Sequence, residues 1–272
     1  MKVTVNQVVY HLTSEGNGTP LVLLHGFSGS VQTWTPLIRD FAASHRVICI
    51  DLLGHGGTDH PPDACRYTMD KQTSDLLAIL DHLQIHQTAL LGYSMGGRTA
   101  LSFACSYPER IRRLVLESAS PGLKTVEQRR RRRQRDEHLA AQIIDNGIVS
   151  FADYWARIPL FASQATLPET VKQVIRNERL SNSAIGLAGS LRGMGTGAQP
   201  SLWPKLTGLH LPTLLITGGN DSKFCGIARE MSGQLPLNRT AVVDGCGHNV
   251  HLENREQFSQ LVRVFLDEEA RG

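Results

Sequence analysis

Residues 92–97, with the sequence GYSMGG, contain a G-x-S-x-G motif centred on Ser94. The motif lies between an apolar run typical of a buried strand and an amphipathic pattern typical of a helix. Small residues two positions before and after the serine permit a sharp, strained turn that presents the hydroxyl at the carboxyl end of the strand. We predict that Ser94 is a reactive serine; the alternative for the motif alone is an ordinary glycine turn.

A serine hydroxyl is barely acidic, so it needs an imidazole to accept its proton and a carboxylate to orient that imidazole. Asp221 closes the apolar run 212–221, and His248 closes the run 239–248. Both side chains should therefore emerge at the sheet edge that carries Ser94. The chain order serine, acid, histidine also matches the order expected after a turn of this kind. We predict a catalytic triad of Ser94, Asp221 and His248.

Two further residues compete for these roles. His251 follows His248 by three positions, where a last helix should begin, and this position favours packing or capping. Asp51 also ends an apolar run, but the glycine-rich loop DLLGHGGTD that it opens favours a turn-stabilising role. We interpret His25 and His55 as structural, because a lone histidine is more often a satisfied polar group than a catalyst.

Six short apolar runs are expected to form the parallel strands that position these residues. Near-continuous Val, Ile and Leu is typical of strands covered by helices on both faces. Helical patterns separate the runs, which predicts an α/β fold with an open sheet, and residues 3–18 indicate an antiparallel hairpin before it. The runs cover residues 20–27, 46–51, 88–94, 113–118, 212–221 and 239–248.

The alternation of strands and helices is interrupted by residues 122–204, which are largely helical and rich in Arg, Trp and Phe. We predict that this segment is a helical cap, and that residues 1–121 and 205–272 form the core. A chain of 272 residues with 41% hydrophobic residues can supply one such domain with an insertion.

Charge and cysteine content exclude several classes of protein. The formal net charge is +3, but six of the positive charges are the arginines between positions 129 and 135, and the rest of the chain has a net charge of 3 − 6 = −3. The basic character is therefore local, and no broad basic surface for nucleic acid is expected. Five cysteines without C-x-x-C spacing argue against disulfides and against a zinc site. Without a signal-peptide core or a membrane-length apolar run, we predict a cytoplasmic protein that binds no metal and does not insert into membranes.

The segment His25-Gly26-Phe27 resembles the loop that donates one N–H group to the oxyanion hole of α/β-hydrolases. Together with the elbow motif, it makes the chain similar to that superfamily over essentially its whole length. The resemblance implies an α/β-hydrolase fold: a mostly parallel sheet flanked by helices, with a helical cap inserted after the sixth strand. It also implies that the backbone N–H groups of Phe27 and Met95 form the oxyanion hole.

Within this superfamily, five segments resemble the 2-succinyl-6-hydroxy-2,4-cyclohexadiene-1-carboxylate synthases of menaquinone biosynthesis. The resemblance implies a lyase that eliminates pyruvate from 2-succinyl-5-enolpyruvyl-6-hydroxy-3-cyclohexene-1-carboxylate to give 2-succinyl-6-hydroxy-2,4-cyclohexadiene-1-carboxylate. It implies a small anionic substrate and no cofactor, and it leaves open whether the pathway is menaquinone or phylloquinone biosynthesis. The segments are GYSMGGR, RRRQRDEHLA, FADYWARIPLF, RNERLSNSAIGLAGSLRGMGTGAQPSLW and GGNDSKF.

The resemblance also implies which residues bind the substrate. Arginines suit this role because the planar guanidinium binds a carboxylate through two charge-assisted hydrogen bonds. The matched positions are Tyr93, Arg98, Arg132, Trp155 and Arg179. Three alternatives stay open: Arg98 paired with an acid on a neighbouring helix, Trp155 as cap core, and Arg176 in place of Arg179.

The arginine run itself has a helical spacing. On a helix, Arg129, Arg132, Arg133 and Asp136 share one side, whereas Arg131 and Arg135 fall on another. We therefore predict that Arg132 alone reaches a substrate carboxylate and that the rest is a solvated surface. The competing functions are a serine esterase or C–C bond hydrolase with the same triad, a non-catalytic binding protein, and a nucleic-acid-binding protein.

Overall fold

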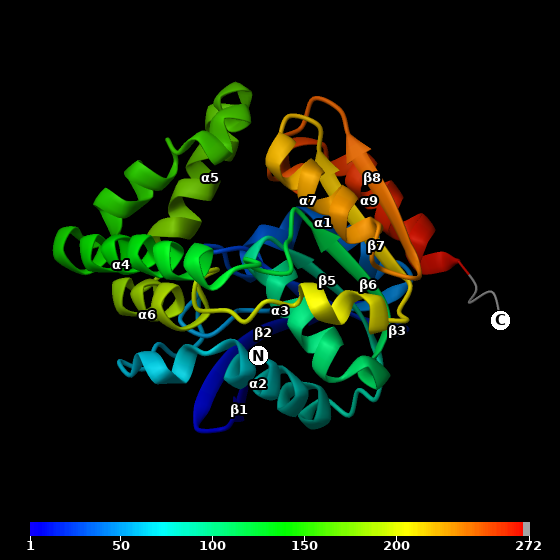
Figure 1. The fold of residues 1–272 in the computed structure, drawn as a ribbon. Helices are drawn as coiled ribbons and strands as arrows, with labels where there is room; N and C mark the ends of the chain where they lie inside the picture. Colours follow the sequence, from blue (N-terminus) through cyan, green and yellow to red (C-terminus); the bar gives the residue numbers. More distant parts are fainter. Residues whose placement is uncertain (269–272) are drawn as a thin grey trace.

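A mixed sheet forms the centre of the molecule in the computed structural model, which describes residues 1–268 (Figure 1). Within these residues the sheet has eight strands in the order β1-β2-β4-β3-β5-β6-β7-β8. β1 and β2 form an antiparallel hairpin, and all strands from β3 onward run parallel. The strands are β1 (Lys2–Val5), β2 (Val8–Glu15), β3 (Thr19–Leu24), β4 (His45–Ile50), β5 (Thr88–Tyr93), β6 (Ile111–Glu117), β7 (Thr213–Gly218) and β8 (Asn238–Val243).

Helices cover both faces of the sheet, which explains the continuous apolar runs. In β3, Leu21 and Leu23 pack on one face while Val22 and Leu24 pack on the other, and all four are fully buried. One face is covered by α2 (Met69–His82), α3 (Met95–Ser106) and α7 (Ser222–Ser232). The opposite face is covered by α1 (Thr35–Ala42) and α9 (Arg255–Asp267).

The six predicted parallel strands are all present, and each ends before the predicted residue; β4, β5 and β6 end one residue early, and the other three end three to five residues early. β3 ends at Leu24, β7 at Gly218 and β8 at Val243, because the chain leaves the sheet there to form loops. The residues beyond these ends are the ones proposed for chemistry. β8 also differs from a buried strand: it lies at the edge of the sheet, and Val242 is 49% exposed.

A helical segment is inserted between β6 and β7, as predicted for a cap after the sixth strand. Figure 1 shows α4, α5 and α6 grouped together beside the sheet. α4 is interrupted at Gly147, whose φ of 78° is non-helical. The exact boundaries at residues 122 and 204 stay a prediction. The elements are α4 (Val126–Trp155), the 3-10 segment η4 (Pro159–Thr166), α5 (Glu169–Leu180) and α6 (Ala184–Met194).

The end of α5 is fixed to the core by a buried carboxylate. Glu178 Oε1 accepts hydrogen bonds from Ser30 N at 2.9 Å, Ser30 Oγ at 2.8 Å and Thr33 Oγ1 at 2.7 Å. At the start of α6, a Cβ atom on Gly186 would lie 2.2 Å from the carbonyl oxygen of Gly54, so the two backbones meet directly. Among the described residues, no helix has the length and apolarity that a bilayer crossing requires.

Candidate active site

The turn between β5 and α3 holds Ser94 in a strained conformation. Ser94 has φ 51° and ψ −104°, a combination that non-glycine residues rarely adopt. A Cβ on Gly96 would lie 2.1 Å from the Leu24 carbonyl oxygen, and one on Gly92 would lie 2.3 Å from the Gly96 carbonyl oxygen. Glycine is therefore required on both sides of the serine, which is the physical basis of the motif.

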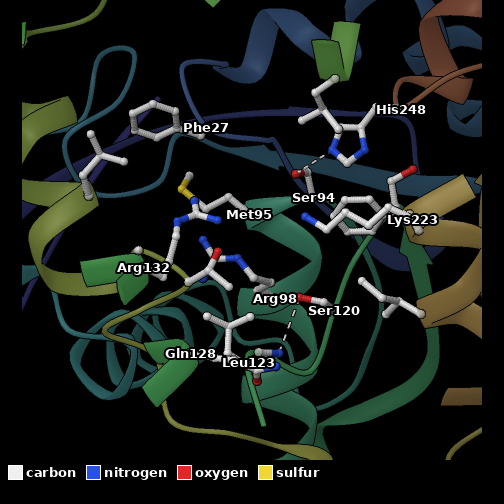
Figure 2. A pocket seen from close by; sticks show the side chains of 18 of the residues that line it. Phe27, Ser94, Met95, Arg98, Ser120, Leu123, Gln128, Arg132, Lys223 and His248 are labelled. Atoms are coloured by element: carbon white, nitrogen blue, oxygen red, sulfur yellow. Dashed lines mark hydrogen bonds between the residues drawn. The ribbon is translucent and has the colours of Figure 1, made fainter. Parts of the chain in front are cut away.

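The structure brings Ser94, His248 and Asp221 together in one hydrogen-bonded chain. His248 Nε2 lies 3.0 Å from Ser94 Oγ, and His248 Nδ1 lies 2.7 Å from Asp221 Oδ2 (Figure 2). The second carboxylate oxygen, Asp221 Oδ1, accepts the Phe224 N–H at the start of α7. Both the imidazole and the carboxylate are buried, so the geometry suits proton transfer from the serine to the histidine.

The N–H groups of Phe27 and Met95 are placed to bind an anion beside Ser94. Both residues line the same cavity as Ser94 and His248. Within residues 1–268 neither N–H donates to a protein acceptor. Met95 is the first residue of α3, where the helix dipole also favours negative charge. The arrangement can therefore stabilise an oxyanion.

The two competing candidates have other partners. His251 Nδ1 lies 2.7 Å from Glu117 Oε2, and the His251 N–H donates to Glu117 Oε1 at 3.0 Å. Asp51 accepts hydrogen bonds from the N–H groups of Val31 at 2.6 Å and Gly57 at 2.8 Å. His251 is therefore held by Glu117, and Asp51 joins the loop that contains Val31 to the loop that contains Gly57.

His25 and His55 are buried beside each other, with ring centroids 5.2 Å apart. His25 Nε2 accepts the Leu52 N–H at 3.0 Å, which requires the neutral ring. Burial lowers the pKa of His25, and it lowers the pKa of His55 to about 3. Both rings therefore have structural contacts and stay neutral at physiological pH.

A cavity of about 420 Å³ opens above Ser94 and extends toward α4. Phe27, Met95 and Leu191 supply apolar surface. Cationic side chains enter it from three helices and one loop, namely Arg98 from α3, Arg132 from α4, Lys223 from α7 and Lys124. Figure 2 shows Arg98 and Arg132 near each other, with Lys223 on the other side of the cavity. This composition suits a small, partly apolar anion.

Arg98 is buried and binds neutral acceptors. Its Nη1 donates to the Met194 carbonyl oxygen at 2.8 Å and to Gln199 Oε1 at 2.7 Å. No acid on a neighbouring helix pairs with it among residues 1–268. Burial, and then the charge of Arg132, lowers the pKa of Arg98 to about 10, so the guanidinium stays protonated. Its charge is therefore available to a ligand.

The arginine run contributes a single side chain to this cavity, that of Arg132. Arg132 Nε donates to Asp136 Oδ1 at 2.7 Å, one helical turn away. The other contacts of the run lie on the surface: Arg129 to the Leu123 carbonyl oxygen, Arg130 and Arg131 to Glu127, and Arg133 to the Gly197 carbonyl oxygen. Arg132 therefore lies on the side of α4 that faces the cavity, the side that the helical spacing indicated.

Trp155 serves both of the roles considered for it. Its ring lies at 5.4 Å from that of Phe151 in a stacked arrangement and at 5.4 Å from that of Phe27 edge-on. It also lines the cavity above Ser94. Trp155 is therefore part of the cap core and part of the cavity wall.

Tyr93 and Arg179 lie outside the cavity above Ser94, in contrast to their expected place in its wall. Both line a smaller adjoining cavity of about 80 Å³, and Phe27 and Trp155 border both cavities. Successive side chains of a strand point in opposite directions, so Tyr93 at the end of β5 turns away from Ser94 and packs on Gly26. The Arg179 guanidinium lies 5.3 Å from the centre of the Phe161 ring.

Arg176, the alternative to Arg179, forms a surface ion pair with Asp153 at 3.1 Å. Arg179 is instead 6% exposed, so it is the arginine of α5 that faces inward.

Gln199, Lys124 and Lys223 were not predicted as site residues. Gln199 holds Arg98 and lies in the segment GTGAQPSLW, which resembles the synthase family, but its side-chain partner could not be identified from that resemblance. Lys223 lines the cavity two positions after Asp221, and its nearness to the acid in the segment GGNDSKF was a usable signal.

Comparison with known proteins places this site in a family. Residues 19–255 match the family model of the alpha/beta hydrolase fold. A relative from Bacillus subtilis (strain 168), provisionally named a 2-succinyl-6-hydroxy-2,4-cyclohexadiene-1-carboxylate synthase, is 48% identical over 98% of both chains. The synthase of Photorhabdus laumondii is 34% identical, covering 90% of this chain and 84% of its own.

A solved structure supports the same grouping. The structure titled MenH from S. aureus is 37% identical, has a TM-score of 0.90 and covers 94% of this chain and 97% of its own. The chain therefore belongs to the α/β-hydrolase fold family and, within it, to the 2-succinyl-6-hydroxy-2,4-cyclohexadiene-1-carboxylate synthase family.

Proposed function

We propose that this chain is a carbon–oxygen lyase that eliminates pyruvate from 2-succinyl-5-enolpyruvyl-6-hydroxy-3-cyclohexene-1-carboxylate in menaquinone biosynthesis. The observation that carries the proposal is the chain Asp221–His248–Ser94 at the base of a cavity that also contains Arg98 and Arg132. A reactive serine beneath guanidinium groups suits an anionic substrate better than a neutral ester. Free cysteines and the bacterial relatives support a cytoplasmic setting.

Ser94 acts as a base in this proposal. His248 accepts the serine proton at Nε2, and Asp221 stabilises the imidazolium through Nδ1. The Ser94 oxygen then takes the proton from the ring carbon next to the succinyl ketone. The electron pair released moves through the ring and breaks the bond to the enolpyruvyl oxygen. The triad returns a proton to the departing enolate, so pyruvate forms and no water is consumed.

The developing negative charge on the ketone oxygen is bound by the N–H groups of Phe27 and Met95. Among the described residues neither group has a competing protein acceptor, and both residues line the cavity with Ser94. Arg98 and Arg132 bind substrate carboxylates, and Trp155 closes the wall beside Phe27. Tyr93 and Arg179 contribute from the adjoining cavity, where Tyr93 Oη donates to Asn249 Oδ1 next to His248.

The test is a coupled pyruvate assay with the enolpyruvyl cyclohexene, read in parallel with the absorbance of the conjugated diene. Ser94→Ala should lower kcat by at least about 1,000-fold, because the proton acceptor is lost. Its fold should be retained, because alanine removes only the hydroxyl. Near-normal pyruvate release by this variant would contradict the role of Ser94. Consumption of water with ester or dienone substrates, and no pyruvate, would favour the hydrolase alternative.

A further inference from the structure

The cations of the cavity differ in whether they already donate a hydrogen bond to the protein. Arg98 binds Met194 and Gln199, Arg132 pairs with Asp136, and Lys124 pairs with Glu230. Lys223 has no hydrogen bond or ion pair with any residue in the range 1–268. The contact found for its ammonium is the ring of Phe224, 5.1 Å from Nζ to the centroid.

The position of Lys223 keeps this free charge directed into the cavity. The residue lies in the first turn of α7, just after Asp221, and lines the cavity together with Ser94 and His248. Figure 2 shows its side chain entering from the α7 side, across the cavity from Phe27 and Arg132. Burial and the charge of Arg132 lower the pKa of Lys223, whereas Asp221 raises it. Arg98, Arg132 and Lys223 thus line one cavity whose lining carboxylate, Glu230, is paired with Lys124. The remaining positive charge favours an anionic ligand there.

The direction of the proposed elimination indicates which substrate group Lys223 meets. The ring carbon that loses its proton must lie at Ser94, and its ketone oxygen must lie toward the N–H groups of Phe27 and Met95. The enolpyruvyl group departs from across the ring, so it is directed away from Phe27. Lys223 occupies that opposite side.

Resting on the proposed function, we propose that Lys223 is a substrate-binding residue whose ammonium binds the carboxylate of the enolpyruvyl leaving group. When the carbon–oxygen bond breaks, its electron pair passes to the enolpyruvyl oxygen. The leaving group then carries a second negative charge until its carbon is protonated. An ammonium beside it stabilises this charge without transferring a proton.

The experiment compares Lys223→Gln and Lys223→Arg with the unchanged protein. Lys223→Gln should lower kcat/KM about 10- to 100-fold, the usual effect of losing a hydrogen bond to a charged group. Lys223→Arg should recover most of this loss. Lys172→Gln removes the same charge from a surface lysine paired with Glu169, outside the cavity, and should leave the kinetics unchanged. Thermal unfolding should be similar in all proteins, because within residues 1–268 the Lys223 ammonium has no hydrogen bond or ion pair to lose.

Product inhibition identifies the group that Lys223 binds. With Lys223→Gln, the inhibition constant of pyruvate should rise about tenfold or more, while that of the cyclohexadiene product should stay the same. Weaker inhibition by the cyclohexadiene alone would overturn the assignment, as would unchanged inhibition by pyruvate. No inhibition of the unchanged protein by pyruvate would also count against it. If the unchanged protein released no pyruvate from the enolpyruvyl substrate, the proposed function itself would fail, whatever the variants did.

Discussion

The two halves of the candidate site are held in place by different kinds of interaction. In the core, backbone contacts fix the triad. The Ser94 N–H donates to the Glu117 carbonyl oxygen at 2.8 Å, and the Asn220 N–H donates to the Cys246 carbonyl oxygen at 2.8 Å. A Cβ on Gly218 would lie 2.1 Å from the carbonyl oxygen of Gly247, so the loops after β7 and β8 are in direct contact.

In the cap, side chains define the site. Arg132 extends from the surface of α4, its side chain is 37% exposed, and its hydrogen bond is to Asp136 on the same helix. Backbone contacts thus fix the triad, whereas the cap contributes to the cavity through a partly exposed side chain of an inserted helix. We therefore expect core substitutions to abolish turnover and cap substitutions to weaken it.

The largest effect should come from Asp221→Asn. Asparagine can still cap α7 by accepting the Phe224 N–H, so folding should be preserved. It cannot orient His248 as a base or stabilise its cation, and kcat should fall about 1,000-fold or more. Steady-state pyruvate release measures kcat, and circular dichroism checks the fold. A loss of less than tenfold with an intact fold would show that the core does not set the chemistry.

A smaller effect is expected in the cap, where two neighbouring arginines form a matched pair. Arg132→Ala should raise KM and lower kcat/KM about tenfold, because a partly exposed guanidinium lines the cavity. Arg131→Ala should change neither quantity, because Arg131 pairs with Glu127 on the surface. The same assay at two salt concentrations separates direct contact from general charge attraction. Equal changes of kcat/KM in the two variants would contradict the assignment of Arg132 to the cavity side of α4 and of Arg131 to its surface side.

Sequence patterns predicted the core better than the cap, for a physical reason. The strained turn at Ser94 needs small neighbours, and parallel strands bring their carboxyl ends to one edge, so the triad follows from local motifs. Strand ends were overestimated because buried residues continue into the loops that follow the strands, for example His25 after β3 and Cys246 after β8. These two residues are buried by tertiary contacts and not by strand pairing.

The cap residues depend on how the helices pack, which local patterns do not specify. Helical spacing was enough for Arg132, since one face of α4 must meet the core. Tyr93 and Arg179, which the family resemblance implied as substrate-binding residues, line the adjoining cavity together with Phe27 and Trp155. Gln199 reaches Arg98 over a sequence distance of 101 residues, so no local motif could indicate this contact.

The smallest effect concerns stability and contrasts a buried core histidine with an exposed cap histidine. Burial lowers the pKa of His55 to about 3, below the ordinary value of 6.5. Between these values the unfolded chain binds the proton and the folded chain does not. The free energy of unfolding should therefore fall with decreasing pH, by about 1 kcal/mol per pH unit from this residue. Urea unfolding at pH 7, 6 and 5 measures this slope. His55→Asn should reduce it, whereas His138→Asn, on the exposed side of α4, should not. Equal slopes in the two variants would indicate that the acid sensitivity does not originate in the core beneath Phe27.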